Sequence, residues 1–179
     1  MAKKSAVVPN TAFKRIKIQL SLSKKDPSLS EMSKNVYYGY PSTTIKSSSE
    51  EKFEKYCEAS SKIKYWYKNG ESSDEFFSIV YLDKMNKAWT FYPDYIVGDT
   101  KGNIWIIETK GGEDAYGYSK NIDIKIENKY EALKTYAQKY NLKWGFVRDI
   151  DEELYISNAD DYIEDMKSTN WMNLKNYEI

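Results

Sequence analysis

Three charged side chains near the middle of the chain, Asp94, Glu108 and Lys110, have the residue types needed for metal-dependent hydrolysis. Glu108 and Lys110 are two positions apart, so on a strand they emerge on the same face. Carboxylates are ligands that Mg²⁺ prefers, in combination with waters and substrate phosphate oxygens. A lysine beside such a site can help to position or deprotonate a water and can offset charge that develops on phosphorus. The three residues predict a divalent-metal site if the fold brings Asp94 next to the other two.

The segments around these residues predict a hairpin that would bring the acids together. Residues 91–97 and 104–109 have the composition of two apolar strands joined by turn-forming residues. If the turn is centred on Lys101, antiparallel pairing puts Asp94 opposite Glu108, because both are equally far from that position. Opposed side chains have Cβ atoms about 5 Å apart, and two carboxylates that close repel each other unless a proton or a cation lies between them.

The second predicted strand is expected to be buried on both faces, because residues 104–107 are continuously apolar. A buried charge is tolerated mainly when it is paired or bound to a metal, and this favours the metal site. The alternative is an ordinary ion-pair cluster on the surface of a hairpin, which would contribute little to stability.

Two short motifs, Pro93-Asp94 and Glu108-Thr109-Lys110, resemble the signature of the PD-(D/E)XK nuclease superfamily. A longer run resembles the C-terminal nuclease domain of the Res subunit of type III restriction enzymes and of related DEAD/DEAH helicase-nucleases; it comprises residues 66–69, 92–97 and 106–111. The resemblance covers roughly residues 45–150. It implies an α/β fold with a restriction-endonuclease-like core, in which helices flank a central mixed sheet made of an antiparallel meander and a crossover strand.

The resemblance also implies a role for each residue of the site. Asp94 and Glu108 would hold Mg²⁺, or Mn²⁺ as a substitute, with the main-chain carbonyl of Thr109 as a further ligand. Lys110 would act on the attacking water. Glu50, at the start of a helix expected at about residues 50–60, would complete the metal site, as a first-helix glutamate often does in this family.

The same helix start offers a different explanation for its acidic residues. Ser48 and Glu51 have the spacing of a capping box, which gives Glu51 a structural role. Glu50 falls on the stripe that faces the sheet, but it also fits a first-turn acid that is stabilised by the helix dipole. The sequence leaves both interpretations of Glu50 open.

Three further residues, Lys68, Asn69 and Lys129, are candidates for contacts with a nucleic-acid backbone. Turn chemistry is the favoured interpretation of Lys68 and Asn69, because Asn69 precedes a glycine. Lys129 lies near the start of an amphipathic helix expected at 126–140, where a solvated face is the favoured interpretation.

The chain divides into three predicted regions: an N-terminal extension at 1–46, partly disordered and with a basic strand at 13–22; a nuclease-like core at 47–157; and a helical tail at 158–179 that packs on the core. The core is expected to run as a meander whose last two strands are 89–97 and 104–109, followed by a crossover helix and a strand at 143–147. The tail is expected to contain a helix at 160–166, capped by Asn158.

The composition excludes several kinds of site. Histidine is absent, which excludes catalytic triads that use histidine and zinc sites of the Cys₂His₂ type. The single cysteine, Cys57, excludes a disulfide within the chain and suits a reducing cytoplasm. The apolar runs are too short to span a membrane. The 27 basic residues balance 27 acidic ones, which argues against strong DNA binding by the chain alone.

These observations favour a metal-dependent DNA endonuclease domain, the cleavage module of a type III-like restriction or helicase-nuclease system. Its expected partners are DNA, a helicase or ATPase motor, a modification-specificity subunit and possible further copies of itself. The alternative is a non-catalytic docking or DNA-binding module with the same fold in a restriction complex. Cleavage of RNA in place of DNA is a further alternative that the sequence does not exclude.

Overall fold

The computed structural model describes residues 33–36, 47–70, 76–83, 85–111, 125–177 and 179. Most of the predicted N-terminal extension, its basic strand at 13–22 included, lies outside the described residues. The described elements, in chain order, are α2 (Ser48–Ala59), β1 (Ile63–Lys68), β2 (Ile79–Leu82), β3 (Ala88–Phe91), β4 (Tyr95–Asp99), β5 (Ile104–Lys110), α3 (Ile126–Lys139), β6 (Lys143–Ile150), β7 (Glu153–Ser157), β8 (Met172–Asn173) and the 3₁₀ helix η2 (Leu174–Asn176).

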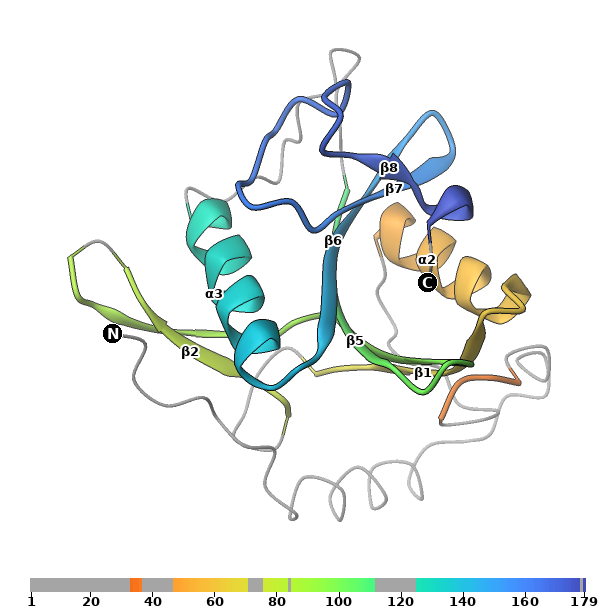
Figure 1. Cartoon of the computed structure of the whole chain (residues 1–179), viewed down its shortest axis with the longest axis horizontal. Helices are drawn as coiled ribbons and strands as arrows, with labels where there is room; N and C mark the ends of the chain where they lie inside the picture. The colour runs from red at the N-terminus through yellow and green to blue at the C-terminus, as the bar shows by residue number, and fades with distance from the viewer. Residues whose placement is uncertain (1–32, 37–46, 71–75, 84, 112–124, 178) are drawn as a thin grey trace.

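The chain forms an α/β domain around a six-stranded mixed sheet with the strand order β1-β4-β5-β6-β7-β8. Strands β5 and β6 are parallel and are connected through α3, whereas the other neighbours in this sheet are antiparallel. The predicted crossover of strand, helix and strand is therefore confirmed. Strands β2 and β3 form a separate antiparallel hairpin that leaves the body of the domain beside α3 (Figure 1).

The predicted register of the central hairpin is confirmed. Tyr95 pairs with Ile107 and Gly98 pairs with Ile104, so the pairing is symmetric about Lys101. One further step in the same register brings Asp94 opposite Glu108. The turn contains a position with a positive φ of 88°, and it is occupied by Gly102, a residue type that adopts such values without strain.

The prediction of one continuous strand at 89–97 is wrong. The strand is broken at Tyr92 and Pro93, and the two halves, β3 and β4, belong to different sheets. Proline has no N–H to donate to a strand ladder, so a central strand does not continue through it. The predicted meander is interrupted as a result, because β1 pairs with β4 and the β2–β3 hairpin is an excursion between them.

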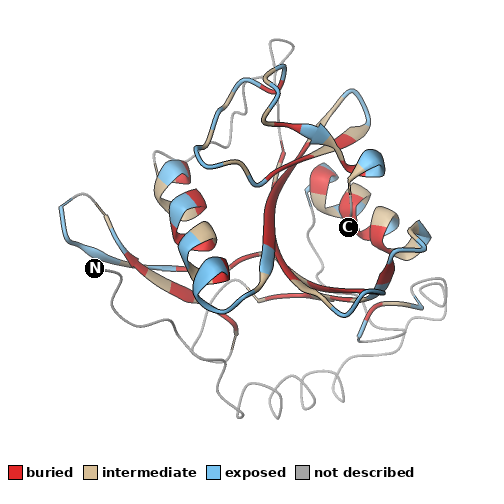
Figure 2. Cartoon of the chain, viewed as in Figure 1, coloured by how far each residue is buried: buried red, intermediate tan, exposed pale blue. Residues whose placement is uncertain are grey.

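The two helices cover opposite faces of the sheet (Figure 1). On one face α2 packs over an apolar core that includes Phe53, Trp66 and Ile107. On the other face α3 packs over a second core that includes Tyr130 and Ile106. Figure 2 shows buried residues along β5 and β6 and exposed residues on the outer sides of both helices. Because alternate residues of β5 enter different cores, Glu108 and Lys110 point to one face at the end of the strand and Thr109 points to the other.

Helix α3 agrees with the predicted amphipathic helix. Its apolar stripe buries Ile126, Tyr130, Leu133 and Ala137. Asn141, predicted to end the helix, has a φ of 53° in the left-handed region, which asparagine adopts more readily than most residues.

The predicted helix at 160–166 is wrong; this part of the tail is irregular. Side chains bind the main-chain carbonyls that a helix would use internally: Tyr130 donates to Ala159 at 2.9 Å, Lys134 to Asp160 at 2.7 Å, Trp171 to Ile163 at 2.8 Å and Arg148 to Glu164 at 2.8 Å. The expectation that the tail packs on the core is confirmed for Trp171 and Leu174, which are buried, but is wrong for Met172, which is 45% exposed.

Candidate functional site

Glu108 is a buried carboxylate near the end of β5, and only one of its two oxygens has a partner among the described residues. Its side chain is 4% exposed, and Lys110 Nζ lies 2.5 Å from its Oε1 atom. Its Oε2 atom is buried and has no hydrogen-bond partner among the described residues. A buried polar atom without a partner is costly and requires an explanation such as an ion or a ligand.

The surroundings of Glu108 favour its protonated form when no cation is bound. Burial, together with repulsion from Asp94, raises the pKa of Glu108 from its ordinary value of 4.5 to about 7, although the charges of Lys110 and Lys129 oppose the rise. The effect of Asp94 means that the two carboxylates are within electrostatic reach of each other. A bound cation would reverse the balance, because it favours the ionised carboxylate.

Asp94 lies at the point where the ladder between β4 and β5 ends. Its Oδ2 atom accepts hydrogen bonds from both the backbone N–H and the hydroxyl of Thr109, each at 2.7 Å. In the register of the hairpin, the Thr109 N–H would face the carbonyl of Pro93, but that carbonyl accepts from Asn69 instead. The carboxylate of Asp94 therefore replaces a main-chain acceptor and is fixed to the backbone of β5.

The carboxylate groups of Asp94 and Glu108 have different neighbours although their backbones are opposed. Ile107 lies in the core under α2 and Ile106 in the core under α3, so alternation puts Thr109 on the α2 side and Glu108 on the α3 side. Asp94 bends toward Thr109 on the α2 side. The expectation that the hairpin gathers both acids and Lys110 at one point is therefore only partly met.

Lys68, the last residue of β1, is the centre of an ion network on the α2 side. Its ammonium contacts Glu50 and lies 3.4 Å from Asp94 Oδ1, and its side chain is 1% exposed. Burial lowers the pKa of Lys68, but the charges of Asp94 and Glu50 outweigh burial and raise it above its ordinary value. The ring of Tyr95 lies 4.6 Å below the ammonium. Lys68 is therefore neither a turn residue nor exposed to solvent, because it lies in β1 and its side chain is buried.

Glu50 performs two functions at once, and the predicted capping box is displaced by one residue. Ser47 caps α2, and its N–H donates to Glu50 Oε2 at 2.7 Å. Glu50 Oε1 accepts from Lys68. Burial raises the pKa of Glu50, but the hydrogen bonds from Lys68 and Ser47 outweigh burial and lower it. Glu51, predicted to be the capping glutamate, instead forms an exposed pair with Lys55 at 2.7 Å.

Asn69 is a buried positioning residue. Its amide nitrogen donates to the carbonyls of Phe77 and Pro93 at 2.7 and 2.9 Å, and its amide oxygen accepts from the Phe77 N–H at 3.2 Å. Its backbone N–H donates to the carbonyl of Asp94 at 2.7 Å. These bonds hold the segment that carries Asp94 and leave the amide buried at 2% exposure.

The predicted site residues thus form two adjoining groups. One contains Glu50, Lys68 and Asp94 on the α2 side, and the other contains Glu108 and Lys110 on the α3 side, where the charge of Lys129 also acts on Glu108. The central position of Lys68 was missed by reasoning from the sequence. The sequence did contain an indication of this position, because Lys68 ends a strand in which Ile63 and Trp66 are buried in the core.

The chemistry of these side chains fits a hard divalent cation, although the described residues form no preformed metal cluster. No group of three or more acidic, histidine or cysteine side chains poised for a metal occurs in the described part of the chain. The orphaned Oε2 of Glu108 and the nearby carboxylate of Asp94 supply oxygen ligands of the kind that Mg²⁺ prefers. For both acids to share one cation, Asp94 would have to exchange its contacts with Thr109 or Lys68.

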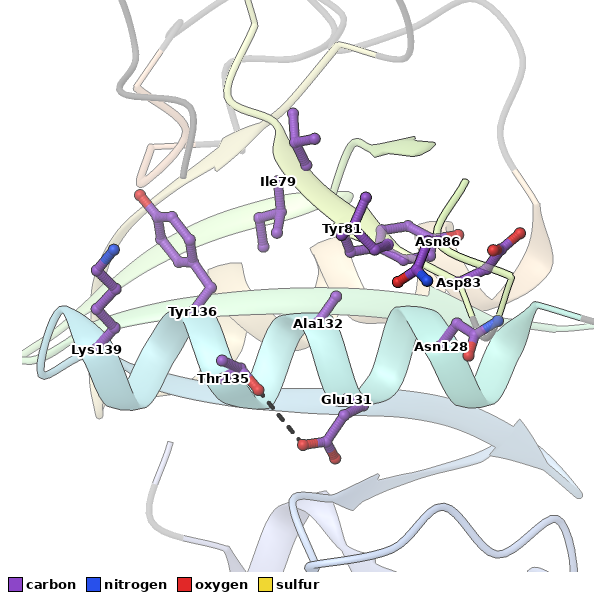
Figure 3. A pocket seen from close by; sticks show the side chains of 12 residues that line it. Ile79, Tyr81, Asp83, Asn86, Asn128, Glu131, Ala132, Thr135, Tyr136 and Lys139 are labelled. Atoms are coloured by element: carbon purple, nitrogen blue, oxygen red, sulfur yellow. Dashed lines mark hydrogen bonds between the residues drawn. The ribbon is translucent and has the colours of Figure 1, made fainter. Parts of the chain in front are cut away.

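A groove of about 290 Å³ lies apart from these acids, between the β2–β3 hairpin and α3 (Figure 3). Tyr81, Asn86, Asn128 and Glu131 are among the side chains that line it. None of the predicted site residues lines the groove.

Comparison of the chain with protein-family models, with curated proteins and with solved structures found no match. The helices among the described residues are all too short or too polar to cross a membrane. The fold class stated above, an α/β domain with a mixed sheet and two flanking helices, is therefore established by the structure alone.

Proposed function

We propose that the chain is a divalent-metal-dependent DNA endonuclease domain of the PD-(D/E)XK type. The observation that carries the proposal is Glu108, a buried carboxylate that is paired on one oxygen with Lys110 and has no partner for the other oxygen in the part of the chain that the structure describes. Burying such a group stabilises no part of the fold unless something binds it. A hard cation held between Glu108 and Asp94 accounts for the open oxygen and for the opposed register of the two acids.

The order of elements supports the finer fold assignment, a restriction-endonuclease-like core. In that core a helix and an antiparallel sheet precede a helix that crosses to a parallel strand. Here α2 precedes β1, β4 and β5, and α3 leads to β6. The β2–β3 hairpin is an insertion in this scheme. The segment resembling type III Res subunits spans most of these elements.

Each side chain of the site has a role in the proposed hydrolysis. A Mg²⁺ ion held by Asp94, Glu108 and the carbonyl of Thr109 would polarise the scissile phosphate and acidify a water when bound. Lys110, which is 18% exposed and beside Glu108, would orient that water and offset charge on the phosphate. Lys68 keeps the carboxylates of Glu50 and Asp94 together despite their repulsion.

A plasmid-nicking assay with Mg²⁺, Mn²⁺ or EDTA tests the proposal. We expect the full chain to nick plasmid DNA with either metal and not with EDTA. Asp94→Asn and Glu108→Gln should each reduce the rate by more than about 100-fold, because loss of a ligand exceeds the 10- to 100-fold loss typical of an outer-shell change. Glu51→Gln, at an exposed acid on α2, is the matched control. Unchanged nicking by either site variant would end the assignment.

A second candidate is a non-catalytic docking or DNA-binding module of a restriction complex with a motor and a modification-specificity subunit. The observation that favours it is the ion network on the α2 side, where Lys68 already neutralises Glu50 and Asp94. Calorimetric titration with Mn²⁺ separates the candidates. A nuclease binds Mn²⁺ in a manner that Glu108→Gln abolishes, whereas a docking module shows no heat that depends on Glu108.

A further inference from the structure

The groove between the β2–β3 hairpin and α3 follows the edge of β2 (Figure 3). Its lining includes all four residues of β2, from Ile79 to Leu82, and none of the residues of β3. Successive side chains of a strand point to opposite faces, so a groove over one face of the hairpin would be lined by alternate residues. A groove lined by consecutive residues of one strand lies along the edge of that strand, beside its backbone.

Backbone hydrogen-bonding groups of β2 point toward this edge. The N–H of Asp83 donates to the carbonyl of Lys87 at 3.0 Å, so the pair that closes the hairpin is hydrogen-bonded. Hydrogen-bonded and non-hydrogen-bonded pairs alternate along an antiparallel ladder, and in this register Tyr81 bonds to β3. Val80 and Leu82 therefore direct their N–H and C=O groups away from β3. Among the described residues β2 pairs with β3 alone, which leaves this edge available.

Helix α3 supplies the opposite wall of the groove. Its lining residues are spaced by three or four positions and so form one stripe of the helix: Asn128, Glu131, Ala132, Thr135, Tyr136 and Lys139. The floor is apolar, because Ile79, Tyr81 and Ala132 are buried there. A strand edge that faces a helix across an apolar floor can accept an extended segment as a further strand. The main chain of such a segment bonds to the edge, and its alternate side chains enter the floor.

The sequence contains a segment with the pattern that this groove requires, the strand predicted at 13–22. Its even positions from 16 to 22 are apolar and its odd positions from 15 to 21 are polar or basic. A strand with one apolar face needs a surface to cover that face. The ten residues between Leu22 and Ser33 span up to about 36 Å when extended. This reach is about twice the radius of gyration of roughly 16 Å expected for a chain of this length.

We propose that residues 13–22 add to the edge of β2 in the same chain, as a third strand of the β2–β3 sheet. Ile18 and Leu20 then lie over the apolar floor of the groove. The polar side chains of the segment lie on the outer face, where the stems of its basic residues cover Val80 and Leu82. The two available N–H groups and the two available C=O groups of β2 acquire partners, and the exposed edge is closed.

The third strand has a consequence for the candidate site, although the proposal does not depend on nuclease activity. A two-stranded hairpin is marginally stable by itself, and a third strand supports it. Asn69 donates to the carbonyls of Phe77, just before β2, and of Pro93, just after β3. The position of the hairpin is therefore linked to the segment that carries Asp94, and the added strand connects the N-terminal extension to that segment.

Amide hydrogen exchange of the full chain, followed residue by residue by NMR, tests the third strand. The amides of Val80 and Leu82 should be protected by bonds to residues 13–22. Ile18→Asp places a charge on the apolar face of the segment and should accelerate exchange at both amides by at least roughly 30-fold, because the edge then opens locally. The amide of Tyr81, which bonds to β3, should stay protected and reports that the hairpin is folded.

Gln19→Asp is the matched control, because it introduces the same charge one residue away on the polar face. It should leave exchange at Val80 and Leu82 unchanged. A second measurement needs no variant: nuclear Overhauser contacts should join the amide hydrogens of Val80 and Leu82 to backbone hydrogens of residues 13–22. These contacts decide the question if Ile18→Asp also exposes the amide of Tyr81.

Each contrary result overturns the proposal in a different way. Rapid exchange of Val80 and Leu82 in the unmodified chain, or absence of the Overhauser contacts, would mean that no strand covers the edge. Protection that survives Ile18→Asp would mean that a different segment or partner covers it. Protection that disappears on dilution would mean that the strand comes from a second copy of the chain. None of these results depends on whether the chain cleaves DNA, so the strand and the nuclease are tested separately.

Discussion

Near the end of β5, the acidic side chains on the two faces of the sheet differ in how far their charges are paired. On the α2 side, Glu50 and Asp94 share the buried ammonium of Lys68, and Asp94 also accepts two bonds from Thr109. On the α3 side, Glu108 has Lys110 on one oxygen and no partner on the other among the described residues.

The difference separates residues that hold the site from residues that could act in it. The α2 group is complete without a ligand, so changes there should appear first in stability. The α3 group is incomplete, so changes there should remove function while relieving the cost of a buried acid. Three changes, from the largest expected effect to the smallest, test this division.

Lys68→Met should have the largest effect. It removes the shared cation and leaves two carboxylates close together with little solvent, so the free energy of unfolding should fall by roughly 3–5 kcal/mol. Urea unfolding at neutral pH measures the loss. Adding Glu50→Gln should restore part of it, because one of the two charges then disappears.

Lys55→Met provides the comparison for Lys68→Met, since Lys55 pairs with Glu51 on the exposed side of the same helix. It should change the free energy of unfolding by no more than about 0.5 kcal/mol. Equal losses for Lys55→Met and Lys68→Met would mean that the α2 network does not hold the site.

Glu108→Gln should change stability in the opposite direction at high pH. With a pKa of about 7 when folded and an ordinary value of 4.5, Glu108 binds more protons in the folded chain than in the unfolded chain between these values. The unmodified chain should therefore lose roughly 3 kcal/mol from this group as pH rises through that window, with no further loss above it.

Urea unfolding at pH 5 and pH 8, without metal, tests this sign. The stability of Glu108→Gln relative to the unmodified chain should rise between the two pH values. Addition of Mn²⁺ at pH 8 should then stabilise only the unmodified chain, because binding to the folded state alone raises stability. A difference between the two chains that is the same at both pH values would contradict the raised pKa of the buried Glu108.

The start of α2 should give the smallest effect. Ser47→Ala removes the capping hydroxyl and should cost about 1 kcal/mol. Ser48→Ala, one residue on, should cost a few tenths at most, because that side chain is exposed and outside the cap. Thermal unfolding of the two variants side by side measures the difference, and the reverse order would restore the capping box expected from Ser48 and Glu51.

The fold was predictable where local chemistry decides the outcome. The turn around Lys101 sets the hairpin register, and the apolar stripe from Ile126 to Ala137 sets α3. Pro93 carried a signal that the prediction of one long strand overlooked, since proline interrupts a ladder. The insertion of the β2–β3 hairpin follows from that break.

Other features depend on contacts that the sequence does not display. Ser47 with Glu50 and Ser48 with Glu51 have identical capping spacing, and Lys68 on β1 decides between them by binding Glu50. The tail at 160–166 is acidic enough to begin a helix, but side chains from α3 and β6 bind its carbonyls. In both cases distant partners determine the local structure.

Gly111 sets the spacing between the site and the first helix. A Cβ atom there would lie 2.6 Å from the hydroxyl of Ser49 on α2 and 3.3 Å from Asp149 Oδ1 on β6. The missing methyl group lets the chain leave β5 in direct contact with the helix that carries Glu50. A side chain at position 111 would clash with Ser49 and push α2 away from the end of β5, and the same movement would draw Glu50 away from Lys68.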